Sequence, residues 1–147
     1  MAHVTVSTLR TRLATAAATV TGFTEGKQPY TAFLRDPATV AHKRFAVGAI
    51  SSSPVQDRQR ASDGTPVRST FRIAFYFRMR PKDQIADYGL ALDAEHALIK
   101  ACMAQTATLL TNTQIVFSGT PRREIDTAGE WFLGELEFIC LHTLALQ

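Results

Sequence analysis

Three arginines lie on one face of a single predicted strand. The stretch from Val67 to Arg80 reads VRSTFRIAFYFRMR, in which large apolar residues occupy alternate positions. A period of two is typical of a strand with one face on a core and the other in polar surroundings. Arg72, Arg78 and Arg80 share the second face. Because guanidinium groups bind carboxylates and phosphates, this face predicts contact with an acidic group, a phosphate or another subunit.

Two glutamates could supply acidic partners for these arginines. Glu135 and Glu137 alternate along the last predicted strand, Glu130–Leu146. If that strand neighbours the arginine strand, the opposite charges can pair across the ladder. Such an exposed pair contributes only about 0–1 kcal/mol. The pattern leaves open a solvated face, a subunit interface and a nucleic-acid contact.

A second group of chemically active residue types lies on a predicted long helix, Asp83–Ala107. It consists of Asp93, Glu95 and His96. Side chains two residues apart on a helix point to different faces, so Asp93 and Glu95 do not form a carboxylate pair. The helix could still supply Glu95 and His96 to a small enzyme or ligand-binding domain, which remains an alternative function.

The rest of the sequence offers no other recognisable catalytic or metal site. The sequence contains no GxGxxG, P-loop, HExxH or GxSxG motif. The other histidines are scattered, and the two cysteines belong to no CxxC or Cys/His cluster; they are His3, His42, His142, Cys102 and Cys140. We therefore expect no enzymatic activity, no catalytic residue, no bound metal and no cofactor.

Composition indicates one folded domain. The 147 residues are 46% hydrophobic and 20% charged, with a formal net charge of +3. This composition can build a core, and the charge is too small to indicate nucleic-acid binding by itself. No apolar run reaches the ~18 residues of a membrane helix, and no signal peptide is evident. We expect a soluble, intracellular protein.

Periodicity predicts the elements that position these residues. A first helix, Val6–Val20, is capped by Thr5 or Ser7. The long helix has an apolar stripe that includes Ile85, Tyr88 and Leu92. The remaining segments are a strand at Arg44–Ser52, a polar loop at Ser51–Pro66 carrying Arg58 and Arg60, the arginine strand, a strand at Thr113–Gly119, a charged turn at Pro121–Gly129 and the last strand.

These elements predict a single α+β domain over residues 1–147. The expected sheet has four strands, is mainly antiparallel and carries two helices on one face, in the order α-β-β-α-β-β. Residues 51–66 would form a long β-hairpin loop, or arm, between the first two strands.

The pattern as a whole resembles a family of phage proteins. Its features are the chain size, the element order, the Ser51–Pro66 loop before FRIAFYFRMR, the helix DYGLALDAEHALIKACM and the strand WFLGELEFICLHTLAL. They are similar to the tail terminator, or tail-tube completion, proteins of long-tailed bacteriophages and gene transfer agents. The resemblance covers most of the chain and rests on pattern, not on an invariant catalytic motif.

The resemblance implies a structural virion protein without enzymatic activity. Such a protein forms a homohexameric ring that caps the tail tube, stops its polymerisation and joins it to the neck. The implied partners are copies of itself, the tail tube protein and a neck or head-tail connector protein, with DNA passing through the lumen and no membrane contact. It would assemble in the host cytoplasm and lie at the head-proximal end of the tail.

The resemblance also suggests which residues make contacts. The loop with Arg58 and Arg60 would be an arm toward the tube or a neighbouring copy. Candidates for subunit or partner contacts are Arg72, Arg78, Arg80, Glu135 and Glu137. A head-tail joining or neck protein of the same particle has a similar outline and is an alternative, as is a small nucleic-acid-binding module.

Overall fold

The computed structural model describes residues 4–26, 42–55, 64–105, 113–119, 121–126 and 129–144. In chain order they form α1 (Val6–Ala18), β1 (Thr24–Glu25), β2 (Arg44–Pro54), β3 (Thr65–Arg78), the 3-10 helix η1 (Pro81–Asp83), α2 (Gln84–Ala104), β4 (Gln114–Phe117), β5 (Arg122–Ile125) and β6 (Trp131–Leu144). Both predicted helices and all four predicted strands are present. The strands β1 and β5 were not predicted.

The predicted fold class is wrong in its sheet. The strands form one six-stranded sheet in the order β1-β2-β3-β6-β4, and β5 also pairs with β6. The sheet is mixed because β1 runs parallel to β2, while the other pairs are antiparallel. The four-stranded, mainly antiparallel arrangement in the order α-β-β-α-β-β therefore does not hold. The charged segment predicted as a turn, Pro121–Gly129, contains β5, which pairs with β6 beyond the part that pairs with β4.

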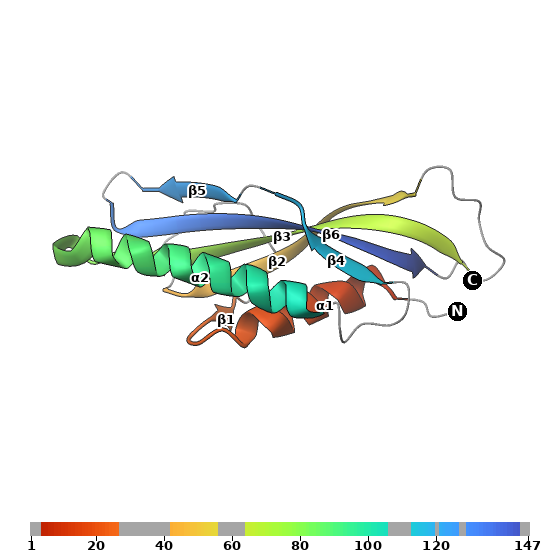
Figure 1. Cartoon of the computed structure of the whole chain (residues 1–147), viewed down its shortest axis with the longest axis horizontal. Coiled ribbons are helices and arrows are strands. Elements are labelled where there is room, and N and C mark those ends of the chain that lie inside the picture. The colour runs from red at the N-terminus through yellow and green to blue at the C-terminus, as the bar shows by residue number, and fades with distance from the viewer. Residues whose placement is uncertain are drawn as a thin grey trace.

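The core lies between the sheet and the two helices, which pack on the same face (Figure 1). On β3 the alternate residues Phe71, Ile73 and Phe75 are fully buried, as the period of two predicted. Full burial of such a side chain contributes about 1.5–3 kcal/mol. The Thr5 side chain caps α1 by accepting a hydrogen bond from the Thr8 amide at 3.1 Å, as expected.

The predicted apolar stripe of α2 is confirmed in part, because Tyr88 and Leu92 pack against the core as expected. Ile85, expected in that stripe, is 89% exposed. The buried positions are Asp87, Ala91, Glu95, Leu98 and Cys102. Two of these buried positions hold carboxylates that the stripe did not predict, and each of them pairs with an arginine outside the helix.

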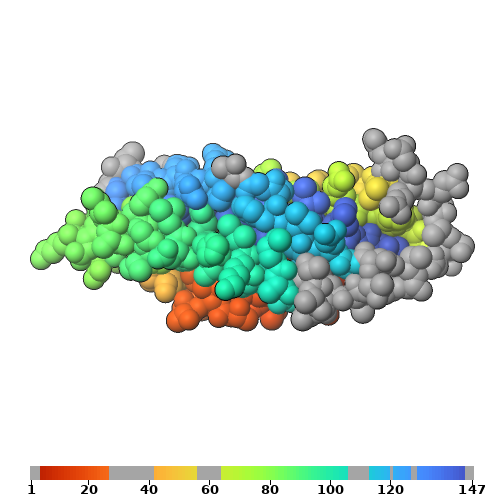
Figure 2. All heavy atoms as spheres, viewed as in Figure 1, coloured from red at the N-terminus to blue at the C-terminus, as the bar shows by residue number. Residues whose placement is uncertain are grey.

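The far end of the β2–β3 hairpin extends beyond both helices (Figure 1). From Ala49 to Pro54 the residues of β2 no longer alternate between buried and exposed. All six are exposed, although the strand stays paired with β3. The space-filling view shows the same elongated outline, with α1 and α2 in adjoining bands (Figure 2). The predicted loop Ser51–Pro66 therefore begins and ends as strand, while Arg58 and Arg60 lie outside the described residues.

Candidate functional site

The predicted pairing of arginine and glutamate across the sheet is confirmed at one arginine. Arg72 lies opposite Glu137 in the β3–β6 register. Its Nε lies 3.3 Å from Oε1 of Glu137 and 3.9 Å from Oε1 of Glu135. The hydroxyl of Ser118 also lies 2.7 Å from Oε2 of Glu137, to which it donates. Because Arg72 and Glu137 are more than a third exposed, the pair is expected to contribute only about 0–1 kcal/mol to folding.

The same face of the sheet is less polar than expected. Tyr76 and Ala74, which alternate with the core residues of β3, are buried, and so is Leu133 on β6. Burial raises the pKa of the Tyr76 hydroxyl. Arginine and glutamate side chains therefore occupy part of a face that also contains buried apolar residues.

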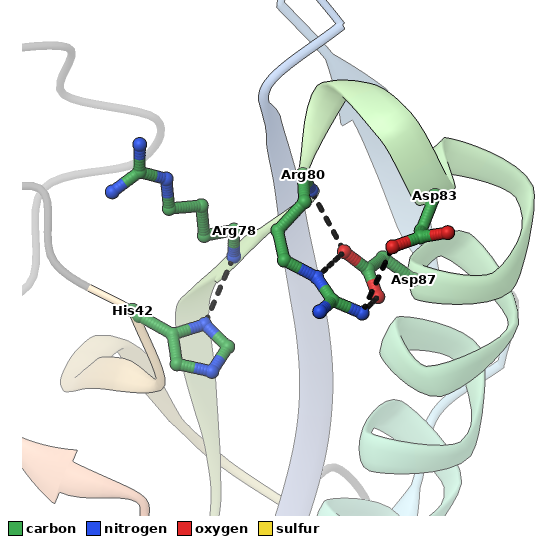
Figure 3. Close-up of polar contacts among 5 residues, drawn as sticks. All are labelled: His42, Arg78, Arg80, Asp83 and Asp87. Carbon is green, nitrogen blue, oxygen red and sulfur yellow. Dashed lines mark hydrogen bonds and ion pairs between the residues drawn. The ribbon is translucent and has the colours of Figure 1, made fainter.

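Arg80 does not belong to this face, because β3 ends at Arg78. Its guanidinium turns toward α2 and binds Asp87 through Nε at 3.0 Å and Nη2 at 3.1 Å (Figure 3). The Arg80 backbone amide donates a third hydrogen bond to Asp87, at 2.7 Å. The hydrogen bonds from Arg80 hold the pKa of Asp87 below its usual range. Arg80 thus fixes the start of α2 to the end of β3.

A groove lies beside this ion pair. It is lined by His42, Lys43, Phe77, Arg78, Arg80, Asp87 and Leu90 and has a volume of about 530 Å³. Nδ1 of His42 accepts a hydrogen bond from the Arg78 amide at 3.0 Å (Figure 3). The imidazole packs edge-on against Phe77, with ring centroids 4.7 Å apart. Sequence reasoning missed this groove because its residues come from the turn before β2, from the end of β3 and from α2.

Glu95 forms a second ion pair that joins α2 to the sheet, after the Arg80–Asp87 pair. Its buried carboxylate accepts two hydrogen bonds from Arg123, one from Nε at 2.9 Å and one from Nη2 at 2.6 Å. Asp93 and His96 are exposed, so the three residues considered for acid–base chemistry point to different surroundings, as the helical spacing predicted. Arg123, the partner of Glu95, was not predicted because it lies on the unpredicted strand β5.

A buried hydrogen-bonded chain joins the N-terminal segment to the sheet. The Ser69 hydroxyl lies 2.7 Å from Nε2 of His142, and Nδ1 of His142 donates to the Val4 carbonyl oxygen at 2.6 Å. The Ser52 hydroxyl lies 2.8 Å from that of Ser69. A serine bonded to a histidine is also the arrangement of a hydrolytic nucleophile. Here Ser69 is 0% and His142 is 2% exposed, so a substrate cannot reach the Ser69 hydroxyl. The hydrogen bonds instead hold Val4 against the sheet.

The described residues contain no cluster of three or more histidine, cysteine or acidic side chains that could hold a metal ion. Neither helix within the described ranges is long and apolar enough to cross a membrane. Cys102 and Cys140 are buried free thiols, and burial raises the pKa of each to about 12.

Comparison with known proteins identifies no family for this chain. A scan against protein-family models and a search of curated proteins both gave no match.

Proposed function

We propose that this protein is a tail terminator, which assembles into a ring of identical subunits, caps a tail tube and joins it to the neck. The proposal rests on the family resemblance of the sequence and on one structural observation, an open strand edge at the end of β2. A head-tail joining protein of the same particle is a second candidate, because the same open edge would serve it.

The open edge is the side of β2 opposite β3, where only a short part of the strand pairs with another strand. β1 pairs with β2 only at Arg44 and Phe45. Within the described ranges no other strand pairs with β2 on that side, which leaves the edge from Ala46 to Pro54 open. Unpaired backbone groups on such an edge can accept a strand from another chain. This supports β2 as a joint between subunits.

The sequence of the edge supports the same function. Residues 46–54 read AVGAISSSP and include no charged side chain. Edge strands that stay exposed are usually protected by a charge, a proline or a β-bulge, and this edge has Pro54 and the irregularity after Ala49 but no charge. Ile50, at the irregularity between Ala49 and Ser51, is 41% exposed. An uncharged edge with an exposed isoleucine is consistent with a strand that a partner covers.

Some of the residues predicted to make ring contacts remain candidates under this proposal, but Glu135 is only 8% exposed and is a weak one. Arg72 and Glu137 are accessible on the outer face of the sheet, where a neighbouring copy could share their pairing. Arg78 is also exposed. Arg80 is a weaker candidate because its guanidinium already binds Asp87.

Native mass spectrometry of charge-insertion variants tests the proposal. Ile50→Lys places a charge on the open edge without touching the buried core, so it should abolish assembly and leave the monomer folded. Ile85→Lys is the matched control, because Ile85 is 89% exposed on α2 and distant in sequence from the edge. We expect hexamers for the wild type and for Ile85→Lys. Assembly that survives Ile50→Lys, or that only Ile85→Lys abolishes, would exclude β2 as the joint.

A further inference from the structure

The sheet has a second border, formed by β4 and β5 on the side of β6 that faces away from β3. β4 pairs with residues 138–141 of β6 and β5 with residues 132–135, so the two short strands follow one another along β6. In the part of the chain that the structure describes, no strand pairs with either of them on the side away from β6. Because a closed ring of identical subunits joins two different surfaces of each copy, this border is a candidate partner for the open edge of β2.

Of the two strands at this border, β4 is partly blocked by α2. The Phe117 amide donates a hydrogen bond to the sulfur of Met103, near the end of α2, at 3.1 Å. A backbone donor bonded in this way is not available to another strand. β5 is also held to α2, but through the side chain of Arg123, whose ion pair with Glu95 does not use the backbone. β5 is therefore fixed in place while its backbone stays available for pairing.

The backbone of β5 offers pairing groups at Arg123 and Ile125. The Asp126 amide donates a hydrogen bond to the Trp131 carbonyl oxygen, at 3.2 Å, and so points toward β6. Backbone groups alternate in direction from one residue to the next along an antiparallel strand. The groups of Ile125, and those of Arg123 two residues earlier, therefore point away from β6, where a further strand would lie.

The open edge of β2 has a segment of the same length. The Phe45 carbonyl oxygen accepts a hydrogen bond from the Gly26 amide at 2.8 Å, so this edge is occupied as far as Phe45. The same alternation directs the backbone groups of Val47 and Ala49 to the open side. The irregularity after Ala49 then interrupts the ladder. Regular pairing is thus confined to residues 46–49, which matches the four residues of β5.

An exposed apolar side chain lies at the end of each segment. Ile50, directly after the open segment of β2, is 41% exposed, and Ile125, the last residue of β5, is 45% exposed. If the two segments pair, these side chains can cover each other, which removes apolar surface from water. Residues 46–49 carry no charge, so the charged side chains of β5 meet no like charge on the partner strand.

We propose that residues 46–49 of one copy pair with β5 of the next copy, so that the sheets of neighbouring subunits continue into one another. This inference rests on the proposed ring and names the segment that covers the open edge of β2. Each joint uses the β2 edge of one copy and the β5 edge of its neighbour. Such a head-to-tail contact closes into a ring when the rotation between subunits allows it.

Cysteine cross-linking identifies the two edges that meet. Ala49→Cys and Ile125→Cys each place a thiol at an exposed position of one edge, and the native cysteines are buried, so the wild type is the control. With a short bismaleimide, the double variant should give cross-linked oligomers up to the full ring. Each single variant and the wild type should stay uncross-linked. Dimers formed by Ala49→Cys alone would show that β2 pairs with β2 of another copy and would overturn the proposal.

Native mass spectrometry of the same proteins separates failure of this inference from failure of the ring. A hexamer of the double variant that gives no cross-links would overturn the pairing of β2 with β5 and leave the ring intact. A wild type that forms no hexamer would overturn both.

A charge on β5 provides a second test of the pairing. Ile125→Lys changes an exposed side chain and should abolish the hexamer, as Ile50→Lys should at the other edge, whereas Ile85→Lys on α2 should leave it intact. A hexamer that survives Ile125→Lys would show that β5 is not the partner of β2.

Discussion

Gly134→Ala should destabilise this protein severely for so small a change. Gly134 lies on β6 directly opposite Phe75 of β3. A β-carbon at this position would lie 2.2 Å from Cε1 and 2.4 Å from Cζ of Phe75. Carbon atoms pack at about 3.5–4.0 Å, so the ring would have to move by more than about 1 Å.

The surrounding core leaves the Phe75 ring little room for this movement. Phe75 is fully buried and packs against Phe23 and Phe132, with ring centroids 6.0 and 5.8 Å away. Overpacking a core costs about 1–3 kcal/mol, and we expect about 3 kcal/mol because the clash involves several ring atoms. For a domain of this length, the loss corresponds to a fall in Tm of about 6–12 °C.

Urea denaturation measures this loss through the fluorescence of the single tryptophan, Trp131. Gly89→Ala on α2 is the matched control. A β-carbon there would meet nothing within 4 Å, so the substitution should stabilise the helix by about 0.5–1 kcal/mol. Adding Phe75→Leu to Gly134→Ala should relieve most of the clash. A loss below about 0.5 kcal/mol for Gly134→Ala, or strictly additive effects in the double variant, would refute this reasoning.

Three further predictions concern buried polar groups. Arg123→Met should cost about 2–4 kcal/mol in urea denaturation because it leaves the Glu95 carboxylate, 5% exposed, without its cation; adding Glu95→Leu should recover most of the loss. Cys102 and Cys140, whose pKa values burial raises to about 12, should resist alkylation at about pH 8 until the protein unfolds, and rapid labelling of the native protein would contradict this. Burial lowers the pKa of His142 from its ordinary 6.5. The free energy of unfolding should therefore be highest above pH 6.5 and fall as the pH drops below it, because the unfolded chain then binds a proton that the folded chain does not. Replacing His142 with glutamine should reduce that fall, and an unchanged profile would argue against a role for His142.

The parts of the fold that the sequence predicted are those with regular apolar spacing. The alternation in β3 predicted its buried face, and the first helix was predicted at Val6–Val20 against Val6–Ala18 in the structure. The sequence also suggested that β3 and β6 lie side by side, because Arg72 could then pair with the two glutamates. The contacts of Arg72 with Glu135 and Glu137 confirm this arrangement.

The missed strands have no such pattern. β1 is two residues long, too short for any periodicity. β5 reads RREI, and its charges suggested a turn; it is held to the sheet by backbone pairing with β6 and to α2 by Arg123. Arg123 and Ile125 alternate with Arg122 and Glu124, which is the one signal that could have indicated a strand.

The charged sites were harder to predict than the core because their partners are distant or irregular. Glu95 was recognised near the helical stripe, but its partner lies 28 residues away on an unpredicted strand. Arg80 was assigned to the sheet face by strict alternation, whereas the strand ends at Arg78 and Arg80 turns to Asp87. The groove beside His42 brings together residues that are distant in the sequence, and no spacing in the sequence indicates that they meet.

Electron microscopy of the protein mixed with the tail tube protein tests the proposed function most directly. We predict sixfold rings at one end of each tube, tubes of limited length, and the loss of both with Ile50→Lys. Tubes that grow without limit and carry no added density at either end, with this protein left as a monomer, would contradict a role as tail terminator.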